Sequence, residues 1–527
     1  MVALALPCAL RGSAALPGHV PGDLSDAGPR GAAVQLALAA ALRERGLAGW
    51  LADDAHGFPA RSDRVAGLGV PLPGLVEAGL APLGPTLAPW AASLGVAMLG
   101  SLGAWVLGRA GGHVRGVLAA AVWCTGAAWL RATHAGDAAA LLSMALLPWV
   151  ACAARGGRLL PAASLAAIAS LGTPELAPVA GLAWWVGSDA RREGPPTDAE
   201  SENKSLAATV AALTPLALPL AWWAAARAVP SPPVMPWATT FMDGLPARPV
   251  DLEAAASLGR AGVVLDTLAR PVLLATAALA WVGARHEVRS LRGTAALAGG
   301  ALVLALGPVW QVPLVGQVVL PWGLLQQIPG LEGRDAPWVC AVGVSLAVCG
   351  LVAREGALPG WRGALLAVGL LAEARVLSPS LPVPSLDLRL DAADAVLARG
   401  RGPLLVLPLP GGALRRDRGD LLAQRVHGRP LVNPLVEVEG PWTSHGERAL
   451  WRDNPALTAL LGCEDGRAAP EADAATVAAA LGRAGIAEVV YDARVPGSDR
   501  ALACTAALLQ GWQRGAEAPL TWWRPPG

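Results

Sequence analysis

Residues 86–108, TLAPWAASLGVAMLGSLGAWVLG, are 23 consecutive positions without a charged side chain. A helix needs about 20 such residues to cross roughly 30 Å of hydrocarbon. One arginine at the centre of a bilayer costs about 2.5–3.5 kcal/mol, whereas one leucine returns only about 0.3–0.6 kcal/mol. The stretch is therefore predicted to span a membrane and not to be a buried helix of a soluble domain.

Similar apolar stretches recur through the first 377 residues. They predict nine further spans, at residues 116–131, 138–154, 159–172, 174–187, 205–226, 263–284, 293–309, 336–353 and 361–377. Residues 1–17 would add an eleventh, although Arg11 interrupts them, and residues 173–175 indicate either a tight turn or a broken helix. Hydrophobic residues make up 54% of the chain and charged residues 15%, against about a quarter charged in a soluble domain. The predicted fold is an α-helical polytopic membrane protein with about 10–11 transmembrane helices in residues 1–377.

Basic residues fall in alternate loops between these spans. One set of loops contains Arg109, His113 and Arg115; Arg155 and Arg158; Arg191, Arg192 and Lys204; Arg285, His286, Arg289 and Arg292; Arg354 and Arg362. Short basic loops stay on the cytoplasmic side. We therefore expect a multi-pass protein of a bacterial inner membrane in which the loop 18–85 and all residues after 377 are extracytoplasmic. The net charge of +1 gives no reason to expect a nucleic-acid partner.

The sequence pattern changes after residue 377, where a proline-rich linker leads into shorter elements. We predict strands at 403–407, 429–432, 487–491 and 519–523, and helices at 473–484 and 500–512. Asp473 is a plausible N-cap, and Gly485 is a stop signal. Alternating helices and strands favour a small α/β domain over residues 378–527. Cys463 and Cys504 could form a disulfide if this domain lies outside the cytoplasm.

An acidic turn, residues 21–26 (PGDLSD), opens the first extracytoplasmic loop. A carboxylate that is partly desolvated at the membrane surface has a raised pKa, which suits general-base chemistry. The same two carboxylates could bind a divalent cation. Pro-Gly-Asp is also ordinary turn chemistry, so a purely structural role stays open.

Short elements in a fixed order carry a family resemblance. They are residues 21–26 (PGDLSD), 56–59 (HGFP) with Asp63, 103–109 (GAWVLGR), 325–337 (LQQIPGLEGRDAP), 407–410 (LPLP), 426–433 (VHGRPLVN) and 485–491 (GIAEVVY). In this order they resemble the GT-C class of polytopic membrane glycosyltransferases and their bacterial relatives. The resemblance implies transfer of a sugar from a polyprenyl-phosphate carrier to an envelope acceptor on the outer face of the membrane.

The resemblance also implies roles for individual residues. Asp23 is the first choice for the general base and Asp26 the second, whereas Asp63 is a candidate for acceptor or cation contacts. Arg334 precedes a proline next to a membrane helix and could bind the carrier phosphate by paired hydrogen bonds; an interfacial arginine with no ligand is the alternative. Many relatives have a second arginine just after that proline, whereas Trp338 follows Pro337 here.

Weaker candidates lie elsewhere in the chain. His134 and Asp137 share a short outer loop and could contact a substrate, although a solvated loop is the simpler reading. Asp266 and Arg270 are spaced to pair on one helix face. The remaining candidates are Asp53 and Asp54 in the first loop, Glu175 as a pocket or capping residue, His427 and Asn433 for an acceptor, and Trp442, Trp522 and Trp523 for stacking on sugars. No CxxC or His/Cys cluster predicts a structural metal site.

The sequence leaves two alternatives to a glycosyltransferase open. A transporter or lipid flippase would show broken helices and charges deep in the spans. A non-catalytic envelope protein would use the C-terminal domain as a binding module, and the absence of the second arginine favours it slightly.

Overall fold

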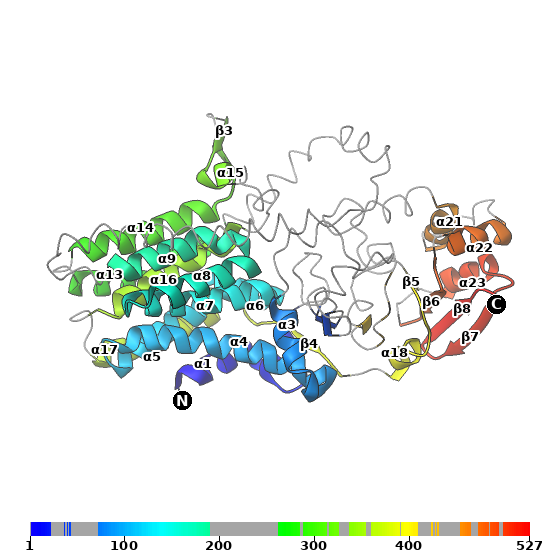
Figure 1. The fold of residues 1–527 in the computed structure, drawn as a ribbon, viewed down its shortest axis with the longest axis horizontal. Helices are drawn as coiled ribbons and strands as arrows, with labels where there is room; N and C mark the ends of the chain where they lie inside the picture. Colours follow the sequence, from blue (N-terminus) through cyan, green and yellow to red (C-terminus); the bar gives the residue numbers. More distant parts are fainter. Residues whose placement is uncertain are drawn as a thin grey trace.

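A computed structural model describes the larger part of the chain. The described residues are 2–22, 36, 39–40, 42–43, 72–189, 262–284, 288–312, 316–325, 337–354, 360–389, 392–408, 423–424, 427, 429, 431, 454–464, 473–483, 485–494 and 499–526. The described residues are mostly helical. Figure 1 shows most of the helices gathered in one bundle, and a small sheet with its own helices near the C-terminus.

Two described helices are long and apolar enough to cross a membrane. They are α4 (Gly84–Arg109), which a short 3-10 turn at Ala81–Leu83 extends, and α7 (Ala138–Arg155). These match the predicted spans 86–108 and 138–154. A bent pair, residues Gly262–Leu268 and α13 (Pro271–Gly283), could form a third span with a 58° bend.

The predicted segments 159–172 and 361–377 each form one helix, although neither passes the test of length and composition for a membrane span. Several other predicted spans are broken or end early. Residues 116–131 were expected as one helix but are divided between α5 (His113–Thr125) and α6 (Ala127–Ala135). Gly126 has extended backbone between the two, and a side chain there would collide with Ser345. The bend within 263–284 follows from Pro271, which has no N–H to donate and disfavours helical geometry at Arg270. The predicted span 205–226 lies outside the described residues.

The other described elements of this region are helices of 3 to 18 residues and one hairpin. These elements are α1 (Val2–Arg11), η1 (Gly12–Ala15), α3 (Leu72–Gly79), α8 (Leu159–Gly172), η4 (Pro174–Leu176), α9 (Ala177–Asp189), α14 (Val288–Ala305), strands β2 (Val309–Val312) and β3 (Gly316–Val319), α15 (Pro321–Leu325), η5 (Pro337–Ala341), α16 (Val342–Val352) and α17 (Gly360–Leu377). The predicted span 293–309 is wrong at its end, because the helix stops at Ala305. The 3-10 turn η4 separates α8 from α9, at the place where the sequence indicated either a tight turn or a broken helix.

Small residues allow the central helices to approach closely. Gly108 of α4 faces Ala119 and Gly116 of α5, and Gly103 lies against the indole of Trp149 on α7. Helix pairs in membranes commonly pack through such small residues because backbones can then come close together. One continuous apolar core therefore joins α1, α4, α5, α7, α9, α14 and α16.

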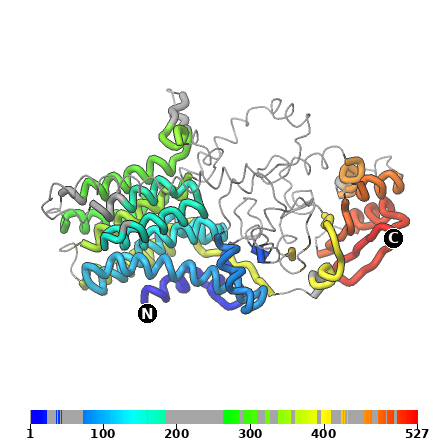
Figure 2. The backbone as a smooth tube through the Cα atoms, viewed as in Figure 1, coloured from blue at the N-terminus to red at the C-terminus, as the bar shows by residue number. Residues whose placement is uncertain are grey.

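A two-stranded sheet ties the N-terminal segment to the linker after α17. Strand β1 (His19–Pro21) pairs antiparallel with β4 (Ser385–Asp387), and Gly22 N donates to Pro384 O over 3.1 Å. Figure 2 shows the blue N-terminal segment beside the yellow segment that contains β4. Residues 18–22 and 384–388 therefore lie together although more than 360 positions separate them.

The C-terminal α/β domain contains a four-stranded sheet. Its strands are β5 (Leu404–Leu407), β6 (Glu488–Asp492), β7 (Gln513–Glu517) and β8 (Leu520–Arg524), in the order β5-β6-β8-β7, with β5 and β6 parallel and the other neighbours antiparallel. The helices are α18 (Ala392–Leu397), α21 (Pro455–Glu464), α22 (Ala474–Arg483) and α23 (Asp499–Leu508). Apolar residues on one face of the sheet, including Leu405, Val489 and Trp523, share a core with α21, α22 and α23.

The sequence predictions for this domain are mostly confirmed. Asp473 caps α22 by accepting a 2.5 Å hydrogen bond from Thr476 N, and Gly485 follows the helix with φ +70°. Cys463 and Cys504 form a disulfide between α21 and α23. One prediction was wrong at its end, because the helix expected at 500–512 stops at Leu508. In the strand expected at 429–432, Leu431 forms a parallel bridge with Leu404, and residues 430 and 432 lie outside the described residues.

Candidate functional site

A mostly apolar pocket lies where β1, α3, α4 and the start of α7 meet. Its cavity volume is about 60 Å³, whereas one water molecule needs roughly 10–15 Å³. The described lining residues are Val20, Pro21, Leu36, Ala39, Pro73, Val76, Glu77, Pro89, Ala92, Ser93, Val96, Gly136, Ala138 and Leu141. The pocket thus has room for several water-sized groups.

Glu77 is the one charged side chain among these lining residues. It belongs to α3 and is only 5% exposed. A carboxylate in an apolar pocket can accept a strong hydrogen bond from a ligand hydroxyl. Sequence reasoning missed Glu77, although it is the single carboxylate in the apolar stretch 72–83 that precedes the first long span.

The pocket borders the point at which the chain enters the acidic turn. Pro21 lines the pocket, and the pairing of β1 with β4 fixes the backbone as far as Gly22. Asp23 is the next residue in the sequence. Asp23, Asp26, Asp53, Asp54, Asp63 and Arg334 all lie outside the described residues.

His134, in the last turn of α6, and Asp137, the N-cap of α7, lie beside two lining residues of the pocket. Asp137 is 1% exposed and caps α7 by accepting a 2.9 Å hydrogen bond from Ala140 N. The Nδ1 atom of His134 is 3.1 Å from Ser380 O, in the segment after α17. The expectation of a solvated loop is therefore wrong, because these two side chains hold the turn that places Gly136 and Ala138 in the pocket wall.

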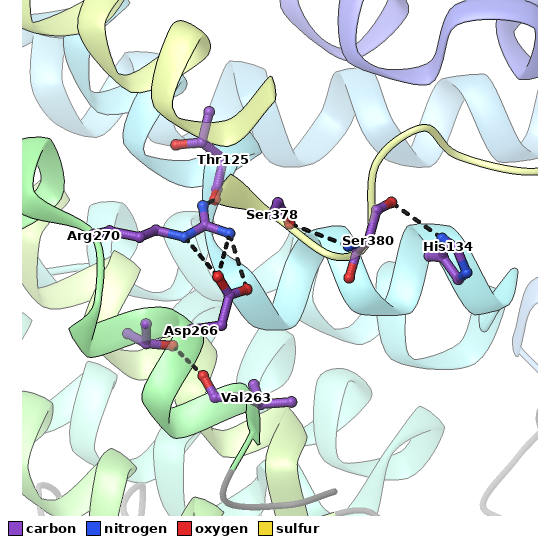
Figure 3. Close-up of polar contacts among 8 residues, drawn as sticks. Thr125, His134, Val263, Asp266, Arg270, Ser378 and Ser380 are labelled. Atoms are coloured by element: carbon purple, nitrogen blue, oxygen red, sulfur yellow. Dashed lines mark hydrogen bonds and ion pairs between the residues drawn. The ribbon is translucent and has the colours of Figure 1, made fainter. Parts of the chain in front are cut away.

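A second charged group occupies the bend before α13. Arg270 and Asp266 form the predicted ion pair, with 3.0 Å between Nη2 and Oδ2, and Arg270 is 2% exposed. Arg270 Nη1 also donates to the backbone carbonyl of Thr125, at the break between α5 and α6 (Figure 3). Glu373 of α17 accepts a 2.6 Å hydrogen bond from Val272 N in the first turn of α13. These contacts satisfy backbone groups that the helix breaks leave without helical partners.

The candidate site residues of the C-terminal domain mainly contact other parts of the domain itself. His427 is buried, and its Nδ1 accepts a 3.1 Å hydrogen bond from Arg429 N. Burial and the nearby Arg429 charge lower the pKa of His427 to about 3, so the ring is neutral at physiological pH. Trp523 is 1% exposed and cannot stack on a sugar, whereas Trp522 is half-buried. Asn433 and Trp442 lie outside the described residues.

The remaining candidate, Glu175, lies in η4 and is completely buried. Its backbone carbonyl accepts a hydrogen bond from Cys340 Sγ over 3.1 Å. Within the described part of the chain, no group of three or more His, Cys, Asp or Glu side chains is arranged to hold a metal ion. No protein-family model, curated protein or solved structure matches this chain.

Proposed function

We propose that this chain is a polytopic glycosyltransferase of a bacterial inner membrane, which transfers a sugar from a polyprenyl-phosphate carrier to an envelope acceptor on the outer face. The observation that carries the proposal is the apolar pocket with a buried carboxylate. Its lining residue Pro21 lies two positions before Asp23 in the sequence. An apolar pocket with one polar group suits a lipid-linked substrate, because the lipid chain and the polar head group need different surroundings.

Two contacts support the proposed sidedness. The pairing of β1 with β4 requires the acidic turn and the linker to the C-terminal domain to share one compartment. The Cys463–Cys504 disulfide favours an oxidising compartment for that domain, since disulfides persist outside the cytoplasm. Both contacts agree with the basic loops facing the cytoplasm.

In this mechanism Asp23, or Asp26 in second place, removes the proton from the acceptor hydroxyl. Arg334 binds the phosphate of the carrier, and Asp63 contacts the acceptor or a divalent cation. Glu77, a buried lining residue of the pocket, accepts a hydrogen bond from a hydroxyl of the acceptor. His134 and Asp137 hold the turn that forms part of the pocket wall and do not contact the substrate, because each side chain is hydrogen-bonded to backbone atoms.

The test replaces Asp23 with Asn and measures transfer from polyprenyl-phosphate-linked sugars by the purified chain in lipid nanodiscs. Loss of a general base should lower the rate by about 10²–10⁴-fold. Asp499→Asn, in the first turn of α23, is the matched control and should keep full activity. Equal activity of Asp23→Asn and the unmodified chain would remove Asp23 as the base. Absence of transfer by the unmodified chain, with every donor tried, would contradict the proposed function.

A transporter or lipid flippase is the second candidate, and the broken helices favour it. The bend of 58° before α13 and the break at Gly126 meet at the buried Arg270–Asp266 pair. Transporters commonly build their binding sites from interrupted helices of this kind. Substrate uptake or lipid scrambling in proteoliposomes, without any transfer chemistry, would favour this reading over a glycosyltransferase.

A further inference from the structure

A half-buried tryptophan lies flat across the edge of the C-terminal sheet. Trp522 of β8 pairs with Gly515 of β7. A Cβ atom added at Gly515 would lie 2.5–2.6 Å from Cε2, Cζ2 and Nε1 of Trp522, so the indole occupies the space that a side chain at residue 515 would fill. One face of the ring therefore covers the glycine backbone, and the exposed part of the side chain reaches the protein surface.

The neighbouring strand is open to solvent. β7 is the last strand in the sheet order, and Figure 1 shows it at the outer edge of the domain beside β8. Every residue of β7 except Gly515 is exposed. Trp522 therefore lies next to a solvent-exposed edge strand of the sheet.

Polar side chains flank the indole on the same face of the sheet. The register places Gln513 opposite Arg524 on one side of the Gly515–Trp522 pair. Glu517 follows on the other side, 4.0 Å from Arg399, and it is 51% exposed. Arg524 is 44% exposed, although its Nη2 donates to Glu488. Hydrogen-bond donors and acceptors thus lie at both ends of one flat aromatic surface.

We propose that Trp522, with Gln513, Glu517 and Arg524 around it, forms a saccharide-binding surface on the C-terminal domain. A pyranose ring has an apolar face of C–H groups, which packs on an indole, and a rim of hydroxyls, which planar amide, carboxylate and guanidinium groups bind well. Trp523 has no such role, because its side chain is in the core and Arg514 lies over its ring at 5.9 Å. A tryptophan that only shields Gly515 would bind no sugar.

The experiment measures binding of cellohexaose, maltohexaose and chitohexaose to the full chain in nanodiscs by isothermal titration calorimetry. At least one hexasaccharide should bind, and Trp522→Ala should weaken that binding by about tenfold, the order expected when one aromatic packing contact is lost. Gly515→Ala keeps the indole but forces it off the strand, so it should weaken binding as well. Trp361→Ala removes an exposed tryptophan on α17 and should leave binding unchanged.

Melting temperatures separate binding from folding. The proposal requires that Gly515→Ala and Trp522→Phe stay folded, and that Trp522→Phe retains more binding than Trp522→Ala. It is overturned if no hexasaccharide binds the unmodified chain, or if Trp522→Ala binds as tightly as Trp361→Ala. Because this assay needs no sugar transfer, its result is independent of the proposed activity.

Discussion

Arg270 donates a hydrogen bond to the backbone carbonyl of Thr125, and this contact joins two helix breaks that are distant in sequence. One break follows Thr125 at the end of α5, and the other precedes Pro271 at the start of α13. Asp266 neutralises the guanidinium from the preceding helix (Figure 3). A buried charge is thereby used to satisfy a carbonyl that the interrupted helix leaves without a partner.

The Arg270–Asp266 pair predicts a strong and asymmetric effect of substitution. Asp266→Asn should lower the free energy of unfolding by about 3 kcal/mol, because it leaves a buried guanidinium without its counter-charge. The double variant Asp266→Leu with Arg270→Met should lose less free energy of unfolding than Asp266→Asn, since it has no buried charge at this site. Melting temperatures in detergent micelles give the comparison, and a double variant less stable than Asp266→Asn would contradict this explanation.

Glu77 predicts an effect on activity and not on folding alone. Glu77→Gln keeps the size of the side chain in the pocket but removes its charge. Under the proposed function, loss of a charge-assisted hydrogen bond of about 1.5–3 kcal/mol should reduce sugar transfer at least about tenfold. Asp499→Asn, assayed beside it, controls for a general effect of removing a carboxylate. Full transfer by Glu77→Gln would mean that the carboxylate does not contact the acceptor.

The sequence predicted the elements whose pattern is local. Residues 86–108 and 138–154 have enough consecutive apolar residues to define α4 and α7 without knowledge of the rest of the chain. The start of α22 was also predictable, because an N-cap is a local hydrogen bond between Asp473 and Thr476. The ion pair of Arg270 and Asp266 followed from their spacing of four residues.

Features that depend on distant contacts could not be predicted. The break at Gly126 depends on the close approach of Ser345, and the β1–β4 pairing joins residues at opposite ends of the bundle sequence. β7 has a polar sequence, QRGAE, and no apolar alternation to indicate a strand. The pocket was missed for the same reason, because Glu77 becomes its charged lining residue only when α3 packs beside α4 and β1.

The Cys463–Cys504 disulfide predicts both a stability effect and a compartment. The two cysteines are 41 residues apart, and closing a loop of that length stabilises a fold by about 4 kcal/mol in the chain-entropy model. Cys463→Ser with Cys504→Ser should therefore lower the melting temperature of the C-terminal domain. In intact cells, a membrane-impermeant thiol reagent should label these cysteines only after reduction. Labelling that requires permeabilised cells would place the domain in the cytoplasm and contradict the proposed topology.

His427 predicts that the stability of the C-terminal domain depends on acid pH. Its pKa is lowered from an ordinary value of 6.5 to about 3, first by burial and then by the charge of Arg429. Between these values the unfolded chain binds a proton that the folded chain does not bind, so stability falls as the pH falls from about 6.5 towards 3. His427 alone changes the free energy of unfolding by at most about 1.4 kcal/mol per pH unit. Replacing His427 with Gln should remove that part of the pH dependence, since glutamine does not titrate. Chemical unfolding of the full chain at pH 7 and pH 5, followed by the loss of C-terminal strand structure, compares the two proteins. A destabilisation on acidification that is equal in both would show that other groups, and not His427, bind the protons.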